Sequence, residues 1–166
     1  MDLLNKNELK SLVAERQKPC ISIFIPTHRE WDKMDIDIIS FKNHVQKLEK
    51  KLKENGLRDK EIDKMLKPAK LLLEDREFWN HQSEGLAVFI APGEFLTYRL
   101  PLKFSELLII SHRFHLKPLL PVLSGDGRYF VLSLNQKKIS LYQGSKYSLS
   151  ELELPANTML SIDDYM

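Results

Sequence analysis

The hydrophobic period of the chain changes at Gly85, and this change constrains the fold more than any other feature of the sequence. Between residues 38 and 73, large apolar residues recur every three or four positions, as they do on one face of a helix. From Gly85 onward they come in short continuous runs separated by turn residues, which is typical of strands. The two patterns together predict an α/β (α+β) fold.

A first strand is predicted ahead of the helical region. Residues 20–25 are apolar and mostly β-branched or aromatic, and Pro26 follows them. The run is too short for a stable helix, so we expect a strand, at the centre of the sheet. The single Cys20 begins this run, where a buried thiol is the expected role.

Three helices are predicted on either side of that strand. A short amphipathic helix follows Asn5 and ends before Pro19. The clearest helix covers residues 38–52, and Asn55-Gly56 provides its stop signal. The apolar period returns over residues 58–75, but Pro68 lacks the amide hydrogen needed inside a helix, so we expect a kink or two abutting helices there.

The segment after Gly85 is predicted to complete the sheet. Residues 86–91 and 95–100 flank a Pro92-Gly93 turn and indicate a hairpin. Residues 107–110 indicate a further buried strand. The apolar residues 114–123 contain two prolines, which limits them to a short or interrupted helix.

The last part of the chain predicts a second domain. Ser124-Gly125-Asp126-Gly127 is a turn by composition, and strand candidates follow at 129–134, 138–142 and 149–154. We therefore expect a mixed, largely antiparallel sheet packed with three to four helices in residues 1–123, followed by a three-stranded antiparallel meander in residues 124–166. No helix is available to cover the meander, so one apolar face stays in water unless it packs on something.

Composition limits the partners of this chain. Its 25 basic and 23 acidic residues leave a formal net charge of +2, so no global field draws it to nucleic acid or membrane. Neither a signal peptide nor a membrane span is expected, because the longest apolar runs have about six residues. These features predict a cytoplasmic protein.

The order of the predicted elements resembles the N-terminal part of archaeo-eukaryotic class-I peptide-chain release factors, and especially their bacterial relatives of unknown function. The resemblance covers nearly the whole chain. The segments that carry it are Cys20–Arg29, Phe41–Asn43, His81–Phe89, Arg113–Pro118 and Leu123–Tyr129.

The resemblance implies a release-factor N-terminal-like domain in residues 1–123 and an incomplete ribonuclease-H-like middle domain in residues 124–166. Release factors carry an Asn-Ile-Lys-Ser motif for stop-codon reading, and the corresponding residues 35–43 lack it. The Gly-Gly-Gln motif for peptidyl-tRNA hydrolysis is also absent from the sequence. We therefore expect a non-catalytic module with no cofactor, which neither reads codons nor hydrolyses peptidyl-tRNA.

The helix over residues 38–52 is the first candidate site. Five lysines and only one acid, Glu49, lie between Lys42 and Lys53, a local charge of about +4. Such a surface could follow the phosphates of ribosomal or other RNA, with affinity that depends on salt. The alternative is an ordinary solvated helix face. No aromatic residue is interleaved with these lysines, which weakens a single-stranded RNA interpretation.

The loop that follows the first strand is the second candidate site. Thr27-His28-Arg29 lies at the carboxyl end of this strand, where α/β sheets tend to present ligand-binding groups. Arg29 could hold a phosphate or carboxylate, or the segment could be a turn bonded to its own backbone. The full set of RNA- or anion-binding candidates is His28, Arg29, Lys33, Lys42, Asn43, Lys47, Lys50 and Lys51.

Other interpretations have less support. His112 and His115 have a spacing that metal sites use, but no further ligand accompanies them, so we expect no metal. Phosphate-ester hydrolysis at Asp126 would need partner carboxylates, and the meander offers only Glu151 and Glu153. The alternative to RNA binding is a protein-interaction scaffold that associates, with a second copy or with another protein, through the uncovered meander.

Overall fold

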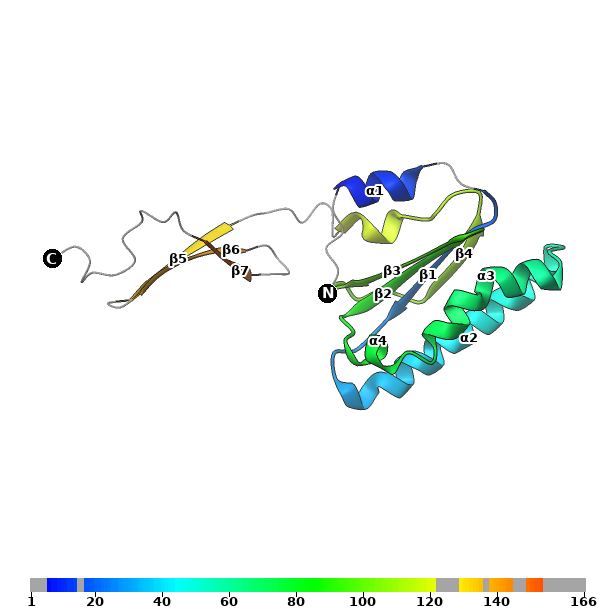
Figure 1. The fold of residues 1–166 in the computed structure, drawn as a ribbon, viewed down its shortest axis with the longest axis horizontal. Helices are drawn as coiled ribbons and strands as arrows, with labels where there is room; N and C mark the ends of the chain where they lie inside the picture. Colours follow the sequence, from blue (N-terminus) through cyan, green and yellow to red (C-terminus); the bar gives the residue numbers. More distant parts are fainter. Residues whose placement is uncertain (1–5, 15–16, 122–128, 136–137, 145–148, 154–166) are drawn as a thin grey trace. The chain divides into compact units, whose positions relative to one another are not determined.

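The structure is a computed structural model that describes residues 6–14, 17–121, 129–135, 138–144 and 149–153. The chain divides into two compact units, residues 1–120 and 121–166 (Figure 1). The units meet three residues before the boundary expected from sequence. The Ser124–Gly127 turn lies outside the described residues.

A four-stranded sheet forms the centre of the N-terminal unit. Its strands are β1 (Cys20–Pro26), β2 (Gly85–Ala91), β3 (Glu94–Leu100) and β4 (Leu107–Ser111). They lie in the order β3-β2-β1-β4, and each pairing is antiparallel. The first predicted strand, β1, therefore has a neighbour on both sides, as expected.

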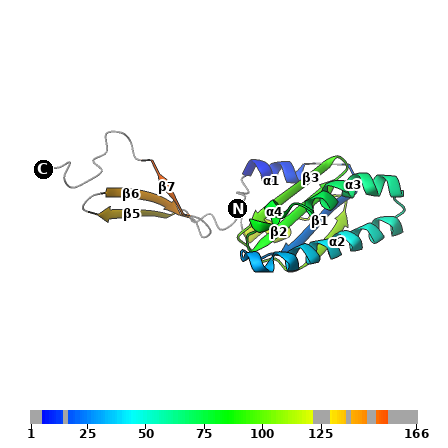
Figure 2. The ribbon, with the colours of Figure 1, turned by 60° about the horizontal axis from the view of Figure 1, so that its bottom comes forward.

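Helices cover both faces of this sheet. They are α1 (Lys6–Val13), α2 (Met34–Glu54), α3 (Asp59–Leu72) and α4 (Arg76–Asn80), with 3-10 helices η1 (Trp31–Lys33) and η2 (Lys117–Leu119). The pair α2 and α3 packs along one face, while α1 and the segment around η2 lie on the other (Figures 1 and 2). The predicted α+β class is confirmed.

The alternation of side chains along β1 and β2 divides the core into two layers. One set packs against α2 and α3, and it comprises Ile21, Ile23, Ile25, Leu86, Val88 and Ile90. The opposite set includes Phe24 and Phe89, whose rings lie 5.8 Å apart and contact Phe104 and Phe114 respectively. Burial on both faces is the physical reason that these strands have continuous apolar sequences.

Two predicted turns position the elements. Helix α2 ends at Glu54, and Gly56 has φ +84°, a left-handed conformation that glycine adopts without steric cost. Strands β2 and β3 are joined by Pro92-Gly93, since Ala91 pairs with Glu94 and Gly93 has φ +82°. Both turns lie where the sequence predicts them.

Helix α3 differs from the expectation at Pro68. It is one continuous helix through this residue, so of the two alternatives expected there, a kink or two abutting helices, the second is wrong. Burial of Met65, Leu66 and Ala69 on the core side offsets the backbone hydrogen bond that a proline lacks. The unpredicted α4 follows, capped by the Asp75 side chain, which accepts a hydrogen bond from the Phe78 amide at 2.9 Å.

The expectation of a buried strand over residues 107–110 is wrong in one respect. The strand forms, but β4 lies at the edge of the sheet, and its first four side chains are only half-buried. A short apolar run has the same sequence pattern in a central strand and in an exposed edge strand. Within the short or interrupted helix predicted over 114–123, residues 117–121 are helical, beginning with η2, and residues 122 and 123 lie outside the described residues.

The C-terminal unit contains the predicted meander. Its strands are β5 (Tyr129–Asn135), β6 (Lys138–Gly144) and β7 (Leu149–Leu152), which pair antiparallel in that order. The register places six large apolar residues on one face, which we call the apolar meander face. These residues are Phe130, Leu132, Leu134, Ile139, Leu141 and Leu152.

Nothing in the part of the chain that the structure describes is a helix both long enough and apolar enough to cross a membrane.

Candidate functional site

The exit of β1 is tied to the segment that precedes β2. The Thr27 hydroxyl donates a hydrogen bond to the Ser83 carbonyl at 2.8 Å, and the Thr27 amide donates to the Glu84 carbonyl at 3.1 Å. Thr27 and Ser83 are both buried. These bonds fix the backbone from which the next residues, His28 and Arg29, project.

His28 is held by a carboxylate that the sequence-based interpretation missed. Asp37, in the first turn of α2, accepts the His28 backbone N–H at 2.8 Å, and its other oxygen lies 2.7 Å from His28 Nδ1. The Asp37 side chain is 2% exposed and that of His28 is 33% exposed. A carboxylate accepts only, so Nδ1 carries the hydrogen and Nε2 is the ring nitrogen left for another partner.

The two cations of this loop are both paired with acids. Arg29 Nε lies 3.0 Å from Glu84 Oε1, and Lys33 Nζ lies 3.6 Å from Glu30 Oε2. A hydrogen bond from its own backbone and the nearby Lys33 lower the pKa of Glu30, so this carboxylate is ionised at neutral pH. Exposed pairs of this kind contribute little to stability, so a ligand phosphate could replace either acid at small cost.

An aromatic side chain stands in the same loop. Trp31 lies between Arg29 and Lys33, at the start of η1, and is 81% exposed. Ile36 and Ile39, on the first turns of α2, are also exposed. The sequence contains a signal for this side chain, because Trp31 interrupts a charged segment that lies outside the lysine-rich helix.

The lysines of α2 remain exposed, and they divide into two groups. Lys47, Lys50 and Lys51 are neighbours at three- and four-residue spacing, and we call them the α2 lysine cluster. Asn43 lies one turn before this cluster on the same side, whereas Lys42 lies on the opposite flank. None of these five side chains forms an ion pair or hydrogen bond with the described residues.

Glu49, the acid among these lysines, lies near cations on the side of α2 that faces α3. Lys53 Nζ lies 3.1 Å from Asp59 and 3.8 Å from Glu49, and hydrogen bonding to Asp59 raises the pKa of Lys53. Glu49 also lies 3.9 Å from Lys70. Glu49, the one acid between Lys42 and Lys53, therefore lies beside cations outside the α2 lysine cluster, and the cluster has no acid partner among the described residues.

The eight predicted site residues thus form two groups and not one pocket. His28, Arg29 and Lys33 lie ahead of α2, while Lys42 and Asn43 lie on its third turn and Lys47 to Lys51 on its fourth and fifth turns. At 1.5 Å per residue, the distance along the helix from Lys33 to Lys47 is about 20 Å. A small ligand could not contact both groups at once.

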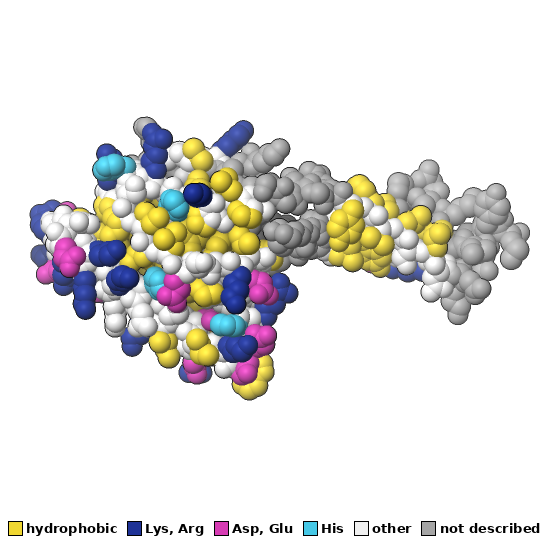
Figure 3. Space-filling view, turned by 180° about the vertical axis from the view of Figure 1, so that it is seen from behind, with side chains coloured by type: hydrophobic (Ala, Val, Ile, Leu, Met, Phe, Trp, Pro, Cys, Tyr) yellow, Lys and Arg dark blue, Asp and Glu magenta, His cyan; other side chains and the backbone are white. Residues whose placement is uncertain are grey.

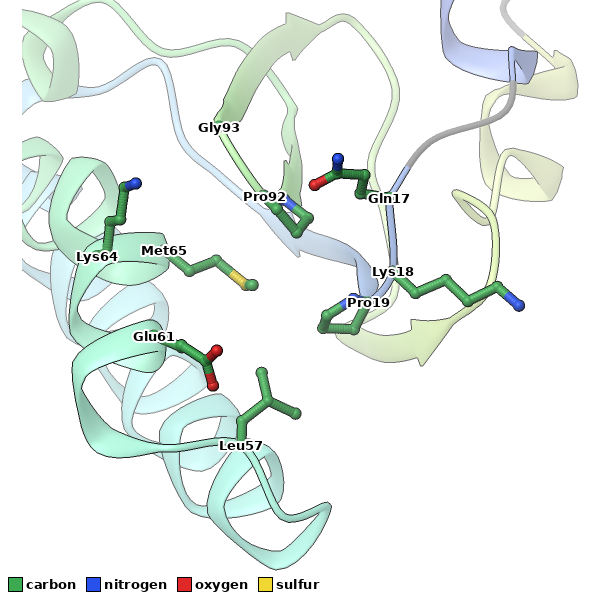
Figure 4. A pocket seen from close by; sticks show the side chains of 9 residues that line it. All are labelled: Gln17, Lys18, Pro19, Leu57, Glu61, Lys64, Met65, Pro92 and Gly93. Atoms are coloured by element: carbon green, nitrogen blue, oxygen red, sulfur yellow. The ribbon is translucent and has the colours of Figure 1, made fainter.

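The pocket shown in Figure 4 lies elsewhere. It has a volume of about 610 Å³ and lies by the start of β1, whereas His28 follows the end of that strand. The Met65 side chain points into it, and Glu61 is engaged by Arg58 at 2.7 Å. Its lining residues are Gln17, Lys18, Pro19, Leu57, Glu61, Lys64, Met65, Pro92 and Gly93.

The residues weighed for metal or hydrolytic chemistry are not brought together. In the described ranges, no three His, Cys, Asp or Glu side chains are placed to share a metal ion. The His115 amide donates to the Ser22 hydroxyl at 2.8 Å, and Glu151 accepts from Lys138 and Ser140, each at 2.8 Å. Asp126 and the neighbouring glycines lie outside the described residues.

Comparison with known proteins assigns no family. No family model matches the chain, and no curated protein matches it. A solved structure described as an archaeal protein is similar, with a TM-score of 0.47 and 14% sequence identity. The similarity covers 96% of this chain and 48% of that one, so the chain spans about half the length of that structure.

Proposed function

We propose that this chain is a non-catalytic, release-factor-like module that binds ribosomal or other structured RNA. The α2 lysine cluster carries the proposal. Lys47, Lys50 and Lys51 are exposed neighbours without an acid partner among the described residues. Like charges at this spacing destabilise a helix by a few tenths of a kcal/mol each, and a polyanion would remove that repulsion.

The loop after β1 extends the proposed surface. Arg29 and Lys33 exchange their exposed acid partners for phosphates, and His28 Nε2 can bond a phosphate or a ribose hydroxyl. Trp31 offers a face for an unpaired base. The distance of about 20 Å between the loop and the α2 lysine cluster favours a structured RNA over a mononucleotide.

A salt series with two charge-matched variants tests this proposal. Changing Lys47, Lys50 and Lys51 together to glutamate removes the cluster. The same change at Lys60, Lys64 and Lys67 of α3, which are exposed and have no ion pair among the described residues, alters the net charge equally. Affinity for ribosomal RNA, measured by filter binding, should fall at least about tenfold for the first variant and much less for the second.

The salt dependence provides a second measure. Loss of three phosphate contacts should reduce the slope of log affinity against log salt by about 2 to 3. The unmodified protein serves as the reference, and circular dichroism confirms that both variants are folded. Equal weakening by the two triple variants would mean that total charge, and not the α2 lysine cluster, causes binding, and affinity that ignores salt would refute the proposal.

A second candidate function is supported by the apolar meander face. On β5 its members Phe130, Leu132 and Leu134 are 60%, 56% and 70% exposed. A face of this kind is typical of a surface that binds another protein, so the alternative is a scaffold that associates through the meander. Leu132→Asp should then abolish association detected by light scattering, while RNA affinity stays unchanged. A Leu132→Asp protein that associates like the wild type would exclude this alternative.

A further inference from the structure

The outer edge of β4 lacks the features that usually protect an edge strand. Among the described strands it pairs with β1 only, and its five residues, Leu-Leu-Ile-Ile-Ser, contain no charge and no proline. Edge strands commonly carry lysine, proline or a bulge that prevents pairing with another chain. At the opposite edge of the sheet, β3 carries Glu94 and Arg99. The two edges of one sheet therefore differ in chemistry.

Among the described residues, β4 borders a groove that is open to solvent. Its residues 108–110 line one side of a shallow groove of about 450 Å³, and Lys51, Glu54 and Asn55 at the end of α2 line the other. Figure 3 shows the N-terminal unit from behind, with a band of hydrophobic atoms across its middle at the level of the sheet. The side chains of residues 107–110 are half-buried although the strand belongs to the sheet.

We infer that β4 is a homodimer interface, in which the β4 strands of two copies pair antiparallel about a two-fold axis. This pairing would join two four-stranded sheets into one sheet of eight strands. A two-fold axis between identical antiparallel strands passes through a residue opposite itself, because neighbouring pairs alternate between hydrogen-bonded and non-hydrogen-bonded types. Ile109 is the middle residue of β4, so centring on it pairs all five residues.

This register is chemically self-complementary. Ile109 faces Ile109 of the second copy, Leu108 faces Ile110, and Leu107 faces Ser111, so no charge is buried within the paired strands. Apolar cross-strand pairs of this kind stabilise antiparallel pairing. One position beyond the strand, Glu106 comes opposite His112 of the second copy, which places an acid beside a nitrogen donor at each end of the interface.

Glu106 is already oriented at the start of β4. One carboxylate oxygen accepts the Ser40 hydroxyl at 3.1 Å, and the other lies 4.0 Å from His44 Nε2. Its side chain is still 58% exposed and so has room for another partner. His112 lies six residues after Glu106, and side chains an even number of residues apart lie on the same face of a strand. If the pairing continues beyond β4, Glu106 and His112 would both project toward the α2 side of the sheet.

The oligomeric state of the full chain tests the inference. Sedimentation of the wild-type protein at about 100 µM should show a dimer, and Ile109→Lys should raise the dimer dissociation constant at least about tenfold. Leu132→Lys, the matched change on the apolar meander face, should leave the dimer intact. A monomeric wild type would overturn the inference, as would a dimer that is lost in Leu132→Lys but kept in Ile109→Lys.

Cysteine cross-linking tests the register without a destabilising charge. Ile109→Cys places the two thiol-bearing Cβ atoms about 4.5–5.5 Å apart, so oxidation should link the two copies. In Leu107→Cys the two cysteines are four positions apart in register, about 14 Å, and should not link. The native Cys20 is 1% exposed and is present in both proteins and in the wild-type control. Equal yields for the two variants, or no link at Ile109→Cys, would refute the register.

Discussion

The two sheets of this protein are built from similar strands but differ in what covers them. In the N-terminal unit, β1 and β2 are buried along nearly their whole length, because α2 and α3 pack on one face and other segments lie on the opposite face. In the C-terminal unit, every residue of β5 is exposed. Both sheets have complete antiparallel registers, so strand pairing alone does not produce a core.

The polar pairs of the two units show the same difference. Asp37 is buried and holds both the backbone and the ring of His28. Lys138 and Glu151 pair at 2.8 Å across β6 and β7, but both side chains are largely in water. A buried carboxylate with two donors is costly to remove, whereas an exposed ion pair contributes little.

The largest expected effect on stability distinguishes the buried core of the N-terminal unit from the apolar meander face. Leu48→Ala removes a side chain that is 0% exposed and should lower the free energy of unfolding of the N-terminal unit by about 2–5 kcal/mol. Leu132→Ala removes the same atoms from a side chain that is 56% exposed and should leave that unit unchanged. Urea unfolding followed by tryptophan fluorescence measures this, since both tryptophans, Trp31 and Trp79, belong to the N-terminal unit.

If Leu48→Ala and Leu132→Ala lowered the free energy of unfolding of the N-terminal unit by a similar amount, the contrast between the two sheets would not hold. It would mean that the apolar meander face contributes to the stability of the N-terminal core. The slope of unfolding free energy against urea concentration distinguishes a loss of stability from a change in how the protein unfolds. A pure loss of stability moves the midpoint and leaves this slope unchanged.

An intermediate effect is expected for the buried polar pair. Asp37→Ala leaves the His28 amide without its acceptor and should lower the free energy of unfolding by about 1–3 kcal/mol. Asp35→Ala, in the same turn but exposed, is the matched control and should change stability very little. Nitrogen NMR of the His28 ring should show the hydrogen on Nδ1 in the wild type and in Asp35→Ala. A ring tautomer that is unaffected by Asp37→Ala would contradict the role given to this carboxylate.

The smallest effect concerns the exposed pair of the meander. Hydrogen bonds from Lys138 and then Ser140 lower the pKa of Glu151 below its ordinary value of 4.5. Because the folded-state pKa is the lower one, the contribution is fully present above pH 4.5 and is lost as the pH falls through the folded value. Amide shifts of β6 and β7 in an NMR titration should report this transition. Glu151→Gln should remove it, and a transition that persists in this variant would assign it to another group.

Local patterns in the sequence predicted most elements of both units. The three- and four-residue spacing marked α2, and Asn55-Gly56 marked its end, because a left-handed glycine terminates a helix whatever lies around it. The Pro92-Gly93 turn was predicted for the same kind of local reason. At Pro68 the sequence left a kink or two abutting helices open, because the packing that lets α3 continue through this proline comes from residues distant in sequence.

The sequence predicted which types of residue form the candidate site but not which side chains pair with one another. Exposed lysines on one helix follow from periodicity, and the α2 lysine cluster was found in this way. The pairing of Arg29 with Glu84 joins residues 55 positions apart, and no local pattern indicates it. Asp37 was missed because its spacing from His28 becomes meaningful only when the loop folds back onto the first turn of α2.

The sequence by itself determined where most of the helices and strands lie, because hydrophobic period and turn residues act over a few positions. It also determined that the meander would have an apolar face. Only the tertiary structure decided that β4 is an edge strand, that Asp37 orients His28, and that Lys53 pairs with Asp59 while the α2 lysine cluster has no acid partner among the described residues. These properties depend on which distant segments come together, and a local pattern carries no information about that.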